Sequence, residues 1–170
     1  MRFSIYVLVA LTTLAGCNPT FNWRDVRPEN TRHSFLMPCK PETAQKIVPL
    51  GGQPTELSLL SCDAGGVTFA VAVADVKEAS KVAPVLAQWQ SAALANIKAT
   101  PDALRMPFKL SGLAAGAVMV KATGQRANGQ AVSSQAVYFA QGSQVFQAVV
   151  YADKISPDVA ETFFSNLKFE

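Results

Sequence analysis

Residues 56–74 contain the pattern that most restricts how this chain can fold. Two strand-like runs, residues 56–62 and 67–73, flank an Asp-Ala-Gly-Gly sequence at 63–66, which has the composition of a hairpin loop. In the second run large apolar side chains alternate with small ones. The large ones are Val67, Phe69, Val71 and Val73. The pattern predicts an inner strand that is covered on both sides, with a helix close against its small-residue face.

The expected helix follows at about residues 80–98. Its apolar residues recur at spacings of three and four, the period of one helical stripe. They are Val82, Leu86, Trp89, Ala93 and Ile97. Ser80 is the expected N-cap, and Thr100 and Pro101 end the helix. Because a tryptophan on such a stripe belongs to the core, we interpret Trp89 as a packing residue and not as part of a binding site.

The rest of the chain is expected to be mostly strand. Residues 34–37 and 46–50 are short strand candidates limited by prolines, and the chain after the helix passes through Pro107 as a loop. Three strands separated by tight Gly- and Asn-containing turns then form an antiparallel meander. These strands are residues 117–124, 132–140 and 144–152.

A final helix is expected to open at Ser156 and Pro157, an N-cap followed by a first-position proline. Its inward residues would be Val159, Phe163, Phe164 and Leu167. The sum is an α+β fold, an antiparallel β-sheet of hairpins plus a meander, packed by two α-helices.

The order of these elements resembles the PsbP-like fold. The resemblance includes the early Phe-Leu-Met-Pro sequence at 35–38 and the closing Phe-Phe-Ser-Asn-Leu sequence at 163–167. Proteins of that fold are mostly non-catalytic binding or assembly factors, so the resemblance implies such a role and names no ligand.

The N-terminal residues have the pattern of an export signal. Arg2 precedes an uncharged, mostly apolar run at residues 3–14, which is shorter than the roughly 20 residues that a transmembrane helix needs. The run ends in Leu14, Ala15, Gly16 and Cys17, which resemble the lipobox of bacterial lipoproteins. An ordinary signal peptide, whose cleavage site also requires small residues, is the alternative.

The lipobox resemblance implies a location. In that family the cysteine thiol receives a diacylglycerol, a peptidase cuts before the cysteine, and the new amine is usually acylated too, for example with palmitate. Cys17 would then anchor the protein stably in a membrane. An aspartate after the cysteine commonly retains such proteins in the inner membrane, and this chain has Asn18 there. The resemblance therefore favours a lipid anchor in the outer membrane, with the domain facing the periplasm.

The expected organisation is a signal peptide at residues 1–16, a lipidated cysteine and tether at 17–32, and a single periplasmic α+β domain at 33–170. A tether of 15 residues could extend about 50 Å. Phe21 and Trp23 leave two alternatives open, because two aromatic side chains here could lie in the lipid headgroups or fold back on the core as an edge strand.

Three cysteines are present, and two remain once Cys17 is lipidated. In an oxidising compartment Cys39 and Cys62 are expected to form a disulfide that stabilises the fold by roughly 3 kcal/mol. The alternative is two buried free thiols.

The sequence contains no catalytic constellation, cofactor motif or metal-ligand cluster. The single histidine, His33, is expected at the surface, and the basic residues are too scattered for a nucleic-acid partner. Six glutamines in the second half could recognise a glycan or an envelope protein, or simply cover a solvated sheet face. They are Gln125, Gln130, Gln135, Gln141, Gln144 and Gln147. We expect a non-catalytic binding or assembly module, the alternative being a small periplasmic hydrolase with a site not visible in the sequence.

Overall fold

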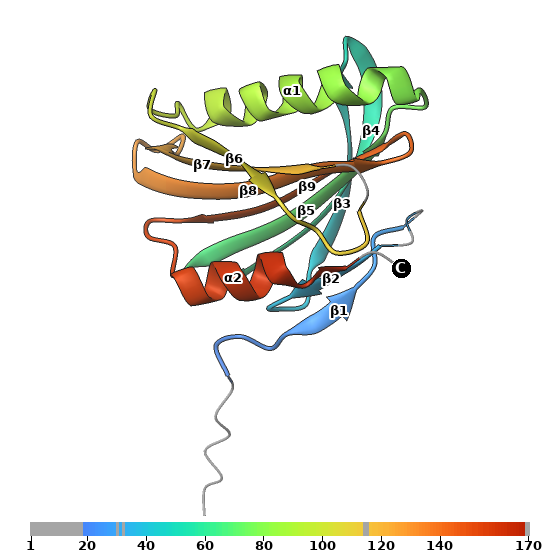
Figure 1. The fold of residues 1–170 in the computed structure, drawn as a ribbon. Helices are drawn as coiled ribbons and strands as arrows, with labels where there is room; N and C mark the ends of the chain where they lie inside the picture. The colour runs from blue at the N-terminus through green and yellow to red at the C-terminus, as the bar shows by residue number, and fades with distance from the viewer. Residues whose placement is uncertain (1–18, 30, 32, 114–115, 169–170) are drawn as a thin grey trace, which may run out of the picture.

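A seven-stranded antiparallel sheet forms the middle of the molecule (Figure 1). The computed structural model describes residues 19–29, 31, 33–113 and 116–168. The strand order is β3-β4-β5-β9-β8-β7-β6, so the pairing of β5 with β9 joins the two halves of the chain. The strands are β3 (Glu42–Leu50), β4 (Gln53–Ala64), β5 (Val67–Asp75), β6 (Leu104–Phe108), β7 (Ala117–Gln125), β8 (Ala131–Gln141) and β9 (Gln144–Ala152).

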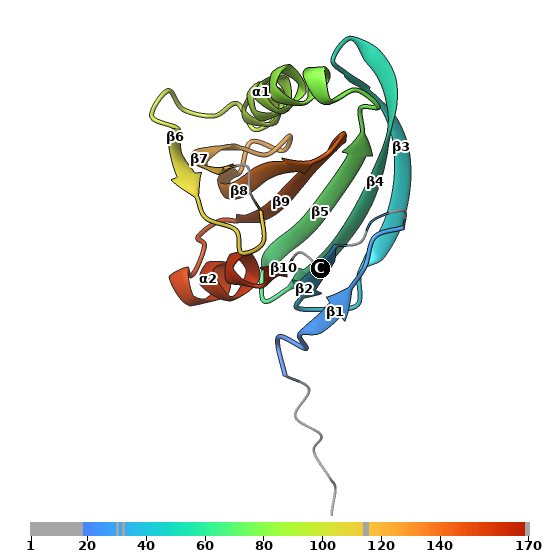
Figure 2. The ribbon, with the colours of Figure 1, turned by 45° about the vertical axis from the view of Figure 1, so that its right-hand side comes forward.

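Both faces of this sheet are covered. Helix α1 (Ala79–Asn96) packs on one face, and helix α2 (Pro157–Ser165) packs on the other beside a small antiparallel sheet (Figures 1 and 2). The small sheet has the order β1-β2-β10 and contains β1 (Arg24–Val26), β2 (Ser34–Met37) and β10 (Leu167–Lys168). The α+β class with an antiparallel sheet and two helices, expected from the sequence, is therefore confirmed.

The alternation in β5 has the predicted consequence. Its large residues, including the fully buried Phe69 and Val71, join the core under α2 and the small sheet. Ala70, Ala72 and Ala74 lie in the second core, together with Val85 and Trp89 of α1. The small side chains leave room for the helix, and Trp89 is a core residue as predicted.

The N-terminal segment is folded back on the domain, so the expected tether over residues 17–32 is wrong for its described part. Strand β1 pairs with β2, and the rings of Phe21 and Trp23 each lie about 6 Å from that of Phe69, at 6.3 and 6.2 Å between centroids. Of the two alternatives, packing on the core is the one observed. Burial of apolar surface provides the physical reason, because Phe21 and Trp23 cover the side of the Phe69 ring that Phe163 of α2 leaves open to them.

Residues 104–108 form strand β6, where the sequence had suggested a loop around Pro107. Strand β6 is an edge strand that pairs only with β7, so the missing N–H of Pro107 costs no ladder hydrogen bond on the outer side.

Helix α1 begins at Ala79, and its N-cap is Glu78, two residues before the expected cap at Ser80. Strands β2, β5, β7, β8 and β9 and the start of α2 lie close to their predicted positions. Strands β3 and β4 begin four and three residues earlier than expected, and Leu167, expected in the last helix, lies in β10.

Cys39 and Cys62 form a disulfide, with 6.0 Å between their Cα atoms. Cys39 follows β2, and Cys62 lies in β4 opposite Phe69. The bond therefore joins the segment after the small sheet to the large sheet at the end where Phe21 packs.

Candidate functional site

The larger of two described hollows has a volume of about 360 Å³ and lies where the β3–β4 turn, the end of β5 and the start of α1 meet. Glu29, from the loop after β1, contributes to its wall. Acidic, basic and neutral hydrogen-bonding side chains share the lining with a few apolar ones. The polar ones are Glu29, Gln53, Thr55, Glu56, Ser58, Asp75, Lys77, Lys81 and Gln144.

A constrained turn after β5 positions two of these charges. The carboxylate of Asp75 accepts the backbone N–H of Lys77 at 2.8 Å and its Nζ at 2.9 Å. These contacts hold Lys77 at a φ of 64°, a left-handed conformation that costs a non-glycine residue about 1 kcal/mol. Partial burial opposes ionisation of Asp75, but the hydrogen bonds from Lys77 and Ser143 lower its pKa below the ordinary value. Asp75 is thus an ionised, already paired group in the wall.

The opposite rim is fixed by the helix. The N–H of Gly51 donates to Oε1 of Gln88 in α1 at 2.7 Å. Gly51 has a φ of +61°, and a Cβ there would lie 2.8 Å from Cγ2 of Val85. A glycine is required at this turn for both reasons, and the hydrogen bond between the Gly51 backbone and the Gln88 side chain fixes this rim to α1.

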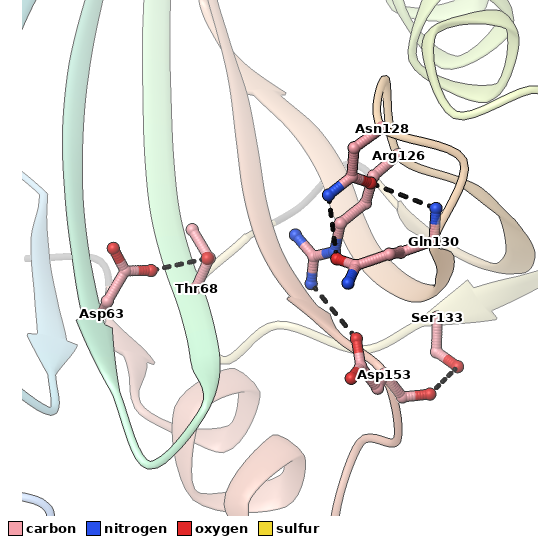
Figure 3. A network of polar contacts seen from close by, with 7 residues as sticks. All are labelled: Asp63, Thr68, Arg126, Asn128, Gln130, Ser133 and Asp153. Carbon is pink, nitrogen blue, oxygen red and sulfur yellow. Dashed lines mark hydrogen bonds and ion pairs between the residues drawn. The ribbon is translucent and has the colours of Figure 1, made fainter.

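The smaller hollow, of about 250 Å³, lies on the sheet face that also carries α2, near the outer strands β6, β7 and β8. Its lining is mainly polar, and Leu104 and Ile155 are its largest apolar residues. Ser133 lines it and donates to the carbonyl of Asp153 at 3.2 Å (Figure 3). Arg126 pairs with the carboxylate of Asp153 at 3.7 Å, so the polar groups beside this hollow mainly bond one another.

His33 is buried, with 1% of its surface exposed, and the expectation of a surface histidine is wrong. The residue precedes β2, which packs on the large sheet, and its ring meets Phe146 edge-on at 4.8 Å between centroids. Burial lowers the pKa of His33, and a hydrogen bond with Gln141 opposes that shift only in part. His33 lines neither hollow.

The six glutamines do not form one site. Gln144 lines the larger hollow and Gln135 the smaller one. Gln147 is buried under α1, where its Nε2 donates to the hydroxyl of Tyr138 at 2.8 Å. Consecutive antiparallel strands place their turns at opposite ends of the sheet, so residues close in sequence are separated in space.

Sequence reasoning missed the larger hollow. Its walls come from residues 29, 50–51, 53–56, 58, 73–77, 81, 85 and 144, which no local pattern connects. Glycines 51 and 52 predicted the turn at its rim, but the left-handed Lys77 has no sequence signal at all.

Other predicted features have mixed outcomes. Cys17 lies outside the described residues, whereas the Cys39–Cys62 disulfide is confirmed. Within the described ranges, no three His, Cys, Asp or Glu side chains are placed to hold a metal ion. Neither α1 nor α2 has the length and apolar content needed to cross a bilayer. No protein-family model matches the sequence, and a search of curated proteins finds no match.

Proposed function

We propose that this protein is a lipid-anchored envelope lipoprotein whose domain is a non-catalytic binding or assembly module. The anchor would be Cys17, on the lipobox sequence that precedes it. Asn18 after the cysteine favours the outer membrane, with the domain in the periplasm.

The observation that carries the binding role is the larger hollow. It is preformed, because the Asp75–Lys77 turn and the Gly51–Gln88 hydrogen bond fix two of its sides. A preformed concave site with a few placed polar groups is the usual form of a binding site. Its charges of both signs complement a polypeptide segment that also carries both signs, so an envelope protein is the partner we favour.

A photo-crosslinking residue placed at Thr55 tests this function in intact cell envelopes. We expect a discrete, protease-sensitive adduct that is lost when Glu56→Lys reverses a charge in the same hollow. The matched control is the same crosslinker at Asn128, an exposed residue in the β7–β8 turn that lines neither hollow. Adducts of equal strength from both positions would contradict the proposal, and an adduct removed by a muramidase would show a glycan partner.

The anchor has its own test. The mass of the membrane-extracted protein should correspond to a chain that begins at Cys17 and carries acyl groups. An unmodified N-terminus further along the chain would refute the anchor.

A further inference from the structure

The folded domain begins almost immediately after the expected anchor. Thr20 and Phe21 lie over the β4–β5 turn, where a Cβ on Gly65 would be 3.1 Å from Cγ2 of Thr20 and 2.7 Å from Cζ of Phe21. The N–H of Asn22 donates to the carbonyl of Pro38 at 2.7 Å. The segment is therefore fixed to the domain from Thr20 onward.

The length of the connection limits how far the domain can lie from the lipid. Three Cα–Cα steps join Cys17 to Thr20, which span at most about 11 Å. A lipid-modified cysteine lies in the headgroup layer, which is itself roughly 5–8 Å thick on each side of the bilayer. The end of the domain that carries the β4–β5 turn must consequently touch or nearly touch the headgroups.

The chemistry of this end suits such a contact. The rings of Phe21 and Trp23 are only half-buried against Phe69, so part of each remains exposed. Aromatic side chains that are partly buried and partly exposed are enriched at membrane interfaces.

Two cations flank the aromatic pair. Arg24 folds towards it, with Nε donating to the carbonyl of Asn22 at 3.4 Å, and Lys40 is exposed next to the disulfide. Such cations can pair with the phosphate groups of lipids.

Carboxylates at the same end balance these cations. Asp25 follows Arg24 in β1, Glu42 lies two residues after Lys40, and the carboxylate of Asp63 accepts a hydrogen bond from Thr68 (Figure 3). The contact therefore depends on the aromatic rings and the short connection, and not on the net charge of this end.

We propose that the surface formed by Phe21, Trp23, Arg24 and Lys40 is a membrane-facing surface that contacts lipid headgroups. This inference rests on the proposed lipidation of Cys17. Strand β4 runs away from this end over 12 residues, at most about 36 Å at 3.3 Å per step, to Gln53 in the larger hollow. The β3–β4 turn, which forms one rim of the hollow, thus lies at the opposite end of β4 from the membrane-facing surface (Figures 1 and 2).

The test uses the lipidated protein in vesicles of phosphatidylethanolamine and phosphatidylglycerol that contain a headgroup-region fluorescence quencher. The wild type has two tryptophans, and the Trp23→Phe variant retains only Trp89, which is buried between α1 and the sheet. The emission that differs between the two proteins belongs to Trp23. We expect the quencher in the vesicles to remove most of the Trp23 emission of the wild type. The emission of the Trp23→Phe variant, which comes from Trp89, should not change.

A longer connection provides the control. Ten glycine and serine residues inserted between Asn18 and Pro19 should keep the protein on the vesicles and restore most of the Trp23 emission. Vesicle flotation separates the two proposals: a protein that does not float refutes the anchor. A protein that floats while its Trp23 emission is unaffected refutes the membrane-facing surface alone. Quenching that persists after the insertion would overturn the argument from chain length.

Discussion

Gly124 leaves almost no room for an added methyl group, and Gly124→Ala should destabilise the domain. Gly124 lies in β7 where the end of α1 crosses it, and an added Cβ would lie 2.1 Å from the carbonyl oxygen of Ile97. An ordinary carbon–oxygen contact is about 3.3 Å or longer, so the helix end must move by roughly 1.2 Å. Two hydrogen bonds fasten that end, from the N–H of Gln125 to Ile97 at 2.6 Å and from the N–H of Thr100 to Thr123 at 2.9 Å.

The expected cost follows from these contacts. Each hydrogen bond contributes about 1 kcal/mol, and an overpacked site adds about 1–3 kcal/mol. Alanine recovers about 0.5–1 kcal/mol because it loses less backbone freedom than glycine in a strand. We therefore expect the free energy of unfolding to fall by about 2–4 kcal/mol, and the melting temperature by about 5–15 °C for a domain of this size.

Urea unfolding with the disulfide intact measures this change. Gly116→Ala is the matched control, because a Cβ at Gly116 meets nothing within 4 Å and the residue has no left-handed φ. The control should be neutral or more stable by up to about 1 kcal/mol. If Gly124→Ala stays within about 0.5 kcal/mol of the wild type, the contact between α1 and β7 is not as close as described.

Three further predictions concern the small sheet and its surroundings. Replacing both Cys39 and Cys62 by alanine should lower the free energy of unfolding by about 2–5 kcal/mol, and equal denaturation midpoints for variant and wild type would contradict a stabilising bond. Phe21→Ala should cost about 2 kcal/mol, roughly half the value for a fully buried phenylalanine, whereas a free tether predicts no change in the same urea titration. The third prediction concerns pH. Because burial lowers the pKa of His33 in the folded protein, the unfolded chain binds the proton more readily. Stability should be constant above about pH 6.5 and fall below it by at most about 1.4 kcal/mol per pH unit. His33→Phe should remove this loss between pH 6.5 and 5, and identical pH profiles for the two proteins would show that another group is responsible.

The sequence by itself determined the elements whose signal is local. Alternating side chains of β5 assigned it a core face and a helix face, and the Gly65–Gly66 turn set the hairpin. Ser156 and Pro157 located the start of α2. The disulfide followed from counting cysteines in an expected oxidising compartment. Each of these inferences needs only neighbouring residues or composition, because periodicity and turn preference are properties of the chain itself.

Only the tertiary structure decided which distant residues meet. His33 is buried because β2 packs on the large sheet and places its ring against Phe146. Phe21, expected in a tether, packs on the domain because its ring contacts Phe69. Strand β6 tolerates Pro107 because it lies at an edge, which is a property of strand order. The larger hollow draws its walls from five separate parts of the chain. Such contacts depend on how the helices and sheets pack against one another. The local sequence around a residue does not indicate which distant residue it will contact.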